Sequence, residues 1–372
     1  MKSPIPAKEK KGQVDFILLV IIMCLMLFGF VMLFSANAPR ATGGGIYKTL
    51  IRQGGIFAAG VVVLLFTAAF DYHRYKKYKK LLVYVIGGLM IIVPFFGIMS
   101  HGATRQISLG FISFQPSEFA KVVLVIYYAA RFTNKSTQNV TTDFNNICKS
   151  FGFMGFLCVA CVFQSHMSAA IVIAGLGIMM MIVAGFSFKT TAIGGSILAV
   201  LGTIFIVTEE YRWNRIVALF KPFEHKMDLG WQIIQSLYAV GSGGLFGLGL
   251  GQSRQKYRYL PEAQNDYIYA VVCEELGFIG GLAVIALFAF FVWRGMSIAL
   301  KANDKFGMYM AFGVTSIIGL QMLINIGVVL SVLPSTGMQL PLFSSGGSSM
   351  LVTMWEMGIL LNISKTSRIK KI

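Results

Sequence analysis

Residues 14–36 read VDFILLVIIMCLMLFGFVMLFSA, and Asp15 is the one charged side chain among them. A transmembrane helix needs about 20 predominantly apolar residues, which this stretch supplies. It is longer than the apolar core of a signal peptide. The stretch therefore predicts a retained membrane-spanning helix and directs the search for others along the chain.

The composition of the whole chain agrees with a membrane protein. Of its 372 residues, 56% are hydrophobic and 13% are charged, whereas soluble domains carry about 25% charged residues. So few charges cannot cover a water-soluble surface, and soluble enzyme classes are therefore excluded. The net charge of +17 is explained by basic residues in cytoplasmic loops, so no nucleic-acid partner is predicted.

A window of about 20 residues finds ten apolar stretches. They lie at 14–36, 53–70, 81–99, 116–132, 147–164, 167–185, 190–207, 267–293, 307–332 and 344–362. The fifth and sixth are separated only by Ser165 and His166, so these two spans are expected to form a tight hairpin. We predict an all-α polytopic membrane protein with ten transmembrane helices.

Basic residues give the expected orientation of these spans. If the spans alternate, 20 of the 32 lysines and arginines fall on one side, which is the cytoplasm by the positive-inside rule. Both termini are then cytoplasmic, as tails at 1–13 and 363–372. The opposite side has one long segment, 208–265, whose aromatic and basic side chains suit the lipid headgroup layer. Within it, residues 230–240 have helical spacing. We predict a single membrane domain over residues 1–372.

Ionisable side chains at membrane depth are costly and need a reason. Glu118 and Lys121 stand three residues apart on one helical face, where either a structural ion pair or a substrate role would explain them. Glu274 and Glu275 lie in the first turns of the eighth span. Glu356, in the tenth span, has no cation near it in the sequence and needs a partner from another helix.

Two segments are rich in small residues. The glycine run at 241–251 matches no nucleotide-binding motif, and we expect a tight outer turn that lets backbone approach a lipid or another helix. The segment 344–349, which includes Ser348, opens the tenth span and allows close helix packing. Cys158 and Cys161 lie within an apolar stretch, and the histidines are scattered, so no metal site is predicted.

The polar sequence LPEAQND at 260–266 closes the long outer segment. Its last residue, Asp266, stands at the start of the eighth span, where the helix dipole favours a carboxylate. From the residues alone, an ordinary helix N-cap explains Asp266 best.

These segments together resemble the SEDS family (shape, elongation, division and sporulation). The first block is GATR at 102–105 with FQPSEFAK at 114–121. The second runs from QSLYA at 235–239 through LPEA at 260–263 and Asp266 to EELG at 274–277. The third comprises NIG at 325–327, LP at 333–334 and 340–341, and SGGSS at 345–349. The PEA form and GQSRQK at 251–256 are more similar to the FtsW and sporulation branch than to the RodA branch.

The resemblance implies a ten-helix bundle in the bacterial cytoplasmic membrane. It also implies a peptidoglycan glycosyltransferase that polymerises lipid II into glycan strands at the outer face of that membrane, during division or sporulation. It also implies a class B penicillin-binding protein as partner, with other division or sporulation proteins. The family's catalytic aspartate falls on Asp266, which favours catalysis over the N-cap interpretation. This sequence departs from the family pattern at three places. It has Gln106 where the family usually has Trp, Gln264-Asn265 where the family usually has His-Thr, and Ser165-His166 where the family usually has Pro-Asp.

The implied reaction inverts the donor sugar and releases undecaprenyl pyrophosphate, with Asp266 as general base. The outer-face cations expected to offset pyrophosphate charge are Arg105, Arg212, Arg215 and Lys256. The motif residues expected to bind substrate beside them are Gln115, Ser117, Glu262 and Gln264. The sequence requires no cofactor, although a divalent cation (Mg²⁺ or Mn²⁺) could assist.

Two other functions fit a polytopic protein of this kind. A lipid II flippase would use Glu118, Lys121 and Glu356 along a hydrophilic path, and a divisome scaffold would need no chemistry. Transporters often contain inverted repeats, and no repeat is found in this sequence. The carboxylate of Asp266 among outer-face cations favours the enzyme over both alternatives.

Overall fold

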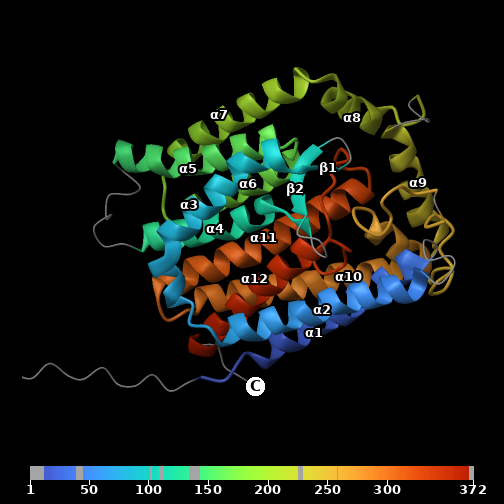
Figure 1. The fold of residues 1–372 in the computed structure, drawn as a ribbon, viewed down its shortest axis with the longest axis horizontal. Helices are drawn as coiled ribbons and strands as arrows, with labels where there is room; N and C mark the ends of the chain where they lie inside the picture. The colour runs from blue at the N-terminus through green and yellow to red at the C-terminus, as the bar shows by residue number, and fades with distance from the viewer. Residues whose placement is uncertain are drawn as a thin grey trace, which may run out of the picture.

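The computed structural model describes residues 12–38, 45–100, 103–108, 113–133, 143–224, 229–257 and 259–367. Helices dominate this part of the chain (Figure 1). They are α1 (Phe16–Asn37), α2 (Gly45–Ala69), α3 (His73–Phe96), α4 (Pro116–Phe132), α5 (Phe144–Phe163), α6 (Met167–Val183), α7 (Phe188–Val207), α8 (Glu210–Phe220), α9 (Leu229–Ser242), α10 (Ile268–Leu300), α11 (Lys305–Val329) and α12 (Gly347–Thr366). Each predicted span falls on one of these helices. Residues 1–11 and 368–372 of the predicted tails lie outside the described residues.

Within the described residues, seven helices are long and apolar enough to cross a membrane: α1, α2, α3, α5, α7, α10 and α11. The interior helix α4 has 17 residues, three of them charged: Glu118, Lys121 and Arg131. It is packed between α3, α6 and α11, so its side chains meet protein and not lipid, and an apolar surface is not required of it. The chain is a multi-pass membrane protein.

The helices form an elongated bundle with α7 along one edge and α1 and α2 along the other (Figure 1). α12 packs most extensively on α2, and α10 packs on both α1 and α11. α7 packs on α6 and α8 and leaves most of its apolar side chains exposed, as a helix facing lipid would. The interior of the bundle therefore lies around α4, α11 and α12.

A buried ion pair joins α1 to α10. Asp15 caps α1 by accepting from the backbone N–H of Leu18 at 2.8 Å. The same carboxylate accepts two hydrogen bonds from Arg294, at 2.6 and 3.1 Å. The span predicted at 267–293 stops before Arg294, whereas α10 continues to Leu300. A bidentate pair explains why an arginine is tolerated in this helix.

Helix α10 is interrupted at Gly277, whose φ of 70° and ψ of −167° suit glycine alone. Four backbone hydrogen bonds join this break to the glycine run, from Leu248 to Glu274, Gly249 to Glu275, Phe278 to Gly244 and Ile279 to Leu245. A Cβ at Gly243 or Gly247 would lie 1.9 or 2.1 Å from a backbone oxygen of α10. The glycine run thus brings backbone against another helix, as its composition predicted.

The structure differs from the all-α prediction in the segment between α3 and α4. Three short antiparallel strands lie there in the order β1-β2-β3: β1 (Ile98–Ser100), β2 (Ala103–Ser108) and β3 (Ser113–Phe114). Strand pairing satisfies backbone N–H and C=O groups of this segment between two helices. The segment 208–265 also contains α8, which was not predicted, whereas α9 covers the predicted helix at 230–240.

Candidate functional site

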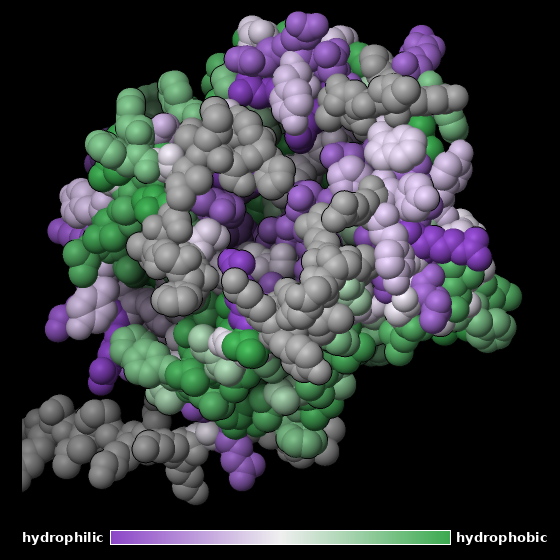
Figure 2. All heavy atoms as spheres, turned by 45° about the vertical axis from the view of Figure 1, so that its right-hand side comes forward, coloured by the Kyte–Doolittle hydropathy of each residue, from purple (hydrophilic) through white to green (hydrophobic). Residues whose placement is uncertain are grey.

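A cavity of about 720 Å³ lies at the end of the bundle that carries β2, α8 and the start of α10. Its lining comes from β2, the α5–α6 turn, α8, α9, the residues before α10 and the segment 334–346. Figure 2 shows this end of the molecule with a hollow whose interior is hydrophilic, beside largely apolar flanks. The site is therefore a polar cavity held on an apolar bundle.

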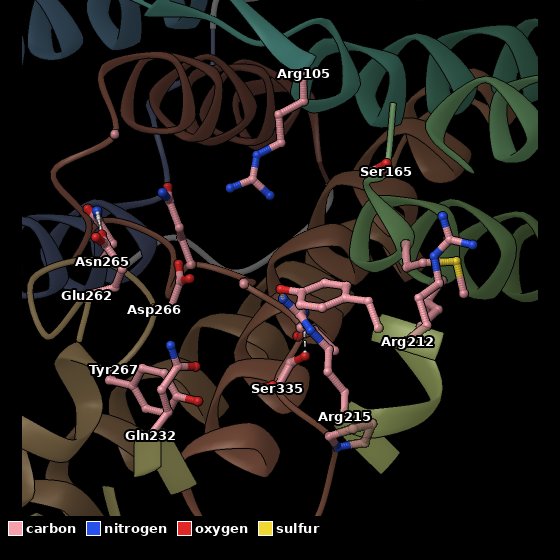
Figure 3. Close-up of a pocket in the computed structure, with 18 of the residues that line it drawn as sticks. Arg105, Ser165, Arg212, Arg215, Gln232, Glu262, Asn265, Asp266, Tyr267 and Ser335 are labelled. Atoms are coloured by element: carbon pink, nitrogen blue, oxygen red, sulfur yellow. Dashed lines mark hydrogen bonds between the residues drawn. The ribbon is translucent and has the colours of Figure 1, made fainter. Parts of the chain in front are cut away.

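Asp266 and Arg105 border the same space in this cavity. Figure 3 shows both side chains pointing into this space. Arg105 lies on β2, and Asp266 directly precedes Tyr267, the N-cap residue of α10. A Cβ added to Gly337, whose φ is +68°, would lie 3.3 Å from Oδ2 of Asp266 and 3.9 Å from Nη1 of Arg105. A glycine at 337 therefore keeps open the space between a carboxylate and a guanidinium.

The turn before Asp266 is organised by Glu262. Glu262 has a left-handed φ of 52°, and its backbone carbonyl accepts from the N–H of Asp266 at 3.1 Å. Its carboxylate accepts from the side-chain amides of Asn265, at 2.7 Å, and Gln264, at 3.3 Å. Glu262 and Asn265 line the cavity, but Gln264 does not. Because Tyr267 occupies the N-cap of α10, the N-cap interpretation of Asp266 was wrong.

Arg212 and Arg215 enter the cavity from α8, on another side from Arg105 (Figure 3). Arg215 donates to the backbone carbonyl of Ser335 at 2.7 Å and to the hydroxyl of Tyr211 at 2.5 Å. The guanidinium of Arg212 lies 3.8 Å from the ring centroid of Phe205. Both cations are thus held in place by α7, α8 and the segment that also carries Gly337.

Lys256 does not join these cations. Its ammonium lies 2.7 Å from the Glu275 carboxylate, and both side chains are fully buried. Ser35 of α1 donates to the same carboxylate. The charge of Lys256 is therefore balanced inside the protein, and its sequence-based assignment as a pyrophosphate ligand does not fit the structure. Glu274 holds the same loop, since it accepts from the hydroxyl of Ser253 at 2.5 Å.

The other predicted polar residues lie behind the cavity wall or deeper in the bundle. Gln115 and Ser117, at the start of α4, are near His166 and do not line the cavity. Ser348 accepts from the backbone N–H of Gln115 at 3.2 Å and donates to the carbonyl of Ser113. It therefore ties α12 to β3, a specific role that close helix packing alone did not predict.

Glu118 and Lys121 form an ion pair of 2.8 Å that is almost completely buried. Glu356 is buried on α12, which packs against α4. None of the three lines the cavity. The pair thus favours the structural interpretation of Glu118 and Lys121.

Sequence reasoning missed several residues that line the cavity: Tyr211, Gln232, Tyr267, Ser335, Thr336 and Gly337. Within the described residues, the hydroxyl oxygens of Tyr267, Ser335 and Thr336 are buried without a hydrogen-bond partner. Nothing in their sequence spacing distinguishes them. Among the residues described, no group of three or more His, Cys, Asp or Glu could hold a metal ion.

Comparison with known proteins places this geometry in a family. A family model described as a cell cycle protein, of the FtsW, RodA and SpoVE type, matches residues 15–369. Stage V sporulation protein E of Bacillus subtilis (strain 168) is 38% identical over 370 residues, covering 96% of this chain and 99% of that protein. A probable peptidoglycan glycosyltransferase FtsW of Geobacter metallireducens is 35% identical over 358 residues, covering 94% of each.

Two solved structures share the fold. The Thermus thermophilus rod shape determining protein RodA matches with a TM-score of 0.71 and 22% identity, covering 96% of this chain and 98% of that one. A chain from a peptidoglycan synthase complex that coordinates polymerization and crosslinking matches with a TM-score of 0.77 and 21% identity, covering 94% and 97%. With a family match over nearly its whole length, the chain belongs to the FtsW, RodA and SpoVE family of cell cycle proteins.

Proposed function

We propose that this chain polymerises lipid II into glycan strands in the cavity that contains Asp266 and Arg105. The chain is a peptidoglycan glycosyltransferase of its family, acting in division or sporulation. The observation that carries the site assignment is the open space at Gly337, bordered by the carboxylate of Asp266 and the guanidinium of Arg105. Glycosyl transfer needs a base for the acceptor hydroxyl and a cation for the leaving pyrophosphate, both beside the space where the sugars react.

Asp266 acts as the general base of the transfer. It takes the proton of a GlcNAc hydroxyl on the acceptor lipid II, and the hydroxyl oxygen attacks the anomeric carbon of the donor. The bond from that carbon to the pyrophosphate oxygen breaks, and undecaprenyl pyrophosphate leaves with the bonding electron pair. Attack opposite the leaving group inverts the anomeric centre. General-base assistance of this kind contributes about 10²–10⁴-fold to a rate.

The arginines stabilise the charge that develops on the leaving group. Arg105, Arg212 and Arg215 line the cavity from two sides, and guanidinium groups bind phosphate oxygens in a bidentate manner. Fixed cations aimed at developing charge lower the barrier without reorganisation at the moment of reaction. A divalent cation, Mg²⁺ or Mn²⁺, could add to this effect at the pyrophosphate, although no ligand cluster in the sequence demands one.

The cavity faces outward in the arrangement that we propose for the bilayer. All ten helices that match the predicted spans cross the membrane, both termini are cytoplasmic, and the whole chain acts as one domain. The basic bias of the sequence supports this orientation. The cavity then lies at the outer face of the bacterial cytoplasmic membrane, where α8 and α9 belong to the outer segment.

A class B penicillin-binding protein is the partner that we propose for this chain, alongside other division or sporulation proteins. One structural neighbour is a chain of a peptidoglycan synthase complex that joins polymerization with crosslinking, which supports the pairing. A transpeptidase beside the cavity would receive each strand as it forms.

The flippase alternative has less support. A flippase would need Glu118, Lys121 and Glu356 along a hydrophilic path. Glu118 and Lys121 instead form an ion pair with each other, and all three side chains are buried. A buried, mutually compensated pair offers no open charge to a passing headgroup.

The test uses the purified full-length protein with labelled lipid II, with and without a candidate class B penicillin-binding protein. Asp266→Asn keeps the size of the side chain and removes the base. We expect wild-type protein to form gel-resolved polymer and the variant to form at least about 100-fold less. Binding of lipid II should survive, because the three arginines are unchanged.

Three results would contradict the proposal. Undiminished polymer from Asp266→Asn would remove Asp266 from the mechanism. Lipid II movement across vesicles without polymer from either protein would favour the flippase. Absence of both activities with the partner present would leave a scaffold role.

A further inference from the structure

His166 lies in the turn between α5 and α6, outside both helices, and is 4% exposed. Its Nδ1 atom lies 2.9 Å from the hydroxyl of Ser117 and 3.3 Å from Nε2 of Gln115. Ser165, immediately before it, lines the cavity and has a left-handed φ of 53° (Figure 3). The imidazole therefore stands directly behind the cavity wall.

The hydrogen bonds around Gln115 run in one direction. The amide nitrogen of Gln106, on β2, donates to Oε1 of Gln115 at 3.5 Å. The amide nitrogen of Gln115 then donates to Nδ1 of His166, because an amide nitrogen has no lone pair to accept with. Nδ1 is thus an acceptor, the ring proton lies on Nε2, and the imidazole is neutral.

The electrostatic surroundings favour the same neutral form. Burial holds the pKa of His166 well below its usual value of 6.5, and the nearby cations Arg105 and Lys121 lower it further. A protonated ring would lose its acceptor and bring an N–H donor against the amide nitrogen of Gln115, which cannot accept. It would also place a third positive charge beside those two cations.

The turn that carries His166 also contacts the opposite wall of the cavity. Ser168, two residues on, donates to the backbone carbonyl of Thr336, which precedes Gly337. On its other side, Gln106 follows Arg105 in β2. The α5–α6 turn and the start of α6 therefore connect two parts of the cavity wall. Ser168 contacts the segment at Gly337, and His166 is linked through Gln115 to the strand that carries Arg105.

We propose that His166 is a positioning residue that sets Arg105 for pyrophosphate binding, through Gln115 and Gln106. This rests on the proposed role of Arg105 in holding lipid II. The structure places Gln106 and His166 at the two ends of one hydrogen-bonded series that passes through Gln115.

The experiment measures binding of fluorescent lipid II with a shortened prenyl chain to the full-length protein. His166→Phe keeps a flat ring without an acceptor, and His166→Asn keeps an acceptor on a smaller side chain. We expect His166→Phe to weaken binding about tenfold and His166→Asn to stay within about threefold of wild type. His73→Phe, an exposed histidine at the start of α3, is the matched control and should bind as wild type.

A double-mutant cycle tests whether the effect passes through Arg105. Arg105→Ala should weaken binding in the wild-type background and weaken it much less in the His166→Phe background, because the guanidinium is already misplaced there. If His166 had a purely structural role, the losses of lipid II binding caused by Arg105→Ala and His166→Phe would be independent of each other. Both His166→Phe and His166→Asn would then also lower the melting temperature.

The outcomes separate the inference from the function that it rests on. Three results would overturn the role of His166 and leave the proposed function standing. They are unchanged lipid II binding by His166→Phe, an equal loss of binding in His166→Asn, and losses that add when His166→Phe is combined with Arg105→Ala. Wild-type protein that neither binds nor polymerises lipid II would overturn the proposed function, and the inference with it.

Discussion

The side-chain amide of Asn325, on α11, donates a 2.7 Å hydrogen bond to the backbone carbonyl of Asp266. The same nitrogen donates to the carbonyl of Met338, also at 2.7 Å. Met338 follows Gly337, whose position borders the carboxylate of Asp266. One buried amide in the bundle therefore holds the proposed base and the segment facing it at a fixed separation.

Replacing Asn325 with Leu should lower both stability and polymerisation. The change keeps the size of the side chain but leaves the carbonyls of Asp266 and Met338 without this donor, at about 1–3 kcal/mol for each buried group. Melting temperature and the kcat of polymer formation are the measurements. Gln321→Leu removes another buried amide from α11 outside the cavity, so it should lower the melting temperature alone. Equal kcat values for the two variants would contradict a positioning role for Asn325.

Lys256→Met should damage folding and leave substrate affinity almost unchanged. Removing one member of a buried ion pair costs about 3–5 kcal/mol, because the Glu275 carboxylate is left without its cation. The double change Lys256→Met with Glu275→Gln should recover much of the loss. The measurements are melting temperature and the KM for lipid II of whatever protein remains folded. A large rise in KM at normal melting temperature would return Lys256 to the substrate site.

Gly277→Ala should strongly destabilise the protein. The φ of +70° is strained for any side chain, at about 1–3 kcal/mol, and the new Cβ would lie 2.4 Å from the backbone nitrogen of Gly247. Gly241→Ala is the control, since a Cβ there has open space and a helical alanine is favoured. Comparison of thermal melting in detergent should show a loss for the first variant and none for the second. A normal melting curve for Gly277→Ala would contradict the break in α10.

Cysteines at exposed positions should report the proposed orientation. Lys77, Lys301 and Glu224 are all exposed, and the exposed Cys24 and Cys148 would first be replaced. An impermeant thiol reagent applied to intact cells should label position 224 and spare positions 77 and 301. Cell lysis should make all three reactive. Labelling of position 77 before lysis would reverse the orientation and place the cavity at the inner face.

The sequence predicts the elements of this fold better than the contacts of its side chains. The bounds of α4 agree with the prediction because Pro116 starts the helix and the apolar run continues to Phe132. Helix α8 was missed because it is short and amphipathic, and an apolar window passes over such a segment. Lys256 was misassigned because the sequence gives its charge and its side of the membrane but does not reveal that Glu275 is its partner.

The proposed base was located by its motif, whereas its surroundings come from segments far apart in the chain. Asp266 borders the same space as Arg105 at Gly337, and is bonded by Asn325, only after β2, α10 and α11 have packed. Single-sequence patterns describe neighbours along the chain, so Ser335 and Thr336 carried no signal. Their contribution to the cavity depends on how the segment after α11 folds back.

The break in α10 bears on the order in which the chain can be inserted into the bilayer. The carbonyls of Glu274 and Glu275 receive hydrogen bonds from Leu248 and Gly249, so α10 does not complete its backbone bonding alone. Unsatisfied backbone groups are costly in lipid. Because the ribosome makes residues 243–249 before residues 273–279, the glycine run has already been made when this part of the helix emerges. The donors that satisfy the carbonyls of Glu274 and Glu275 are thus made before these carbonyls. Synthesis from the N- to the C-terminus suits this fold, because the reverse order would make α10 before its hydrogen-bond donors.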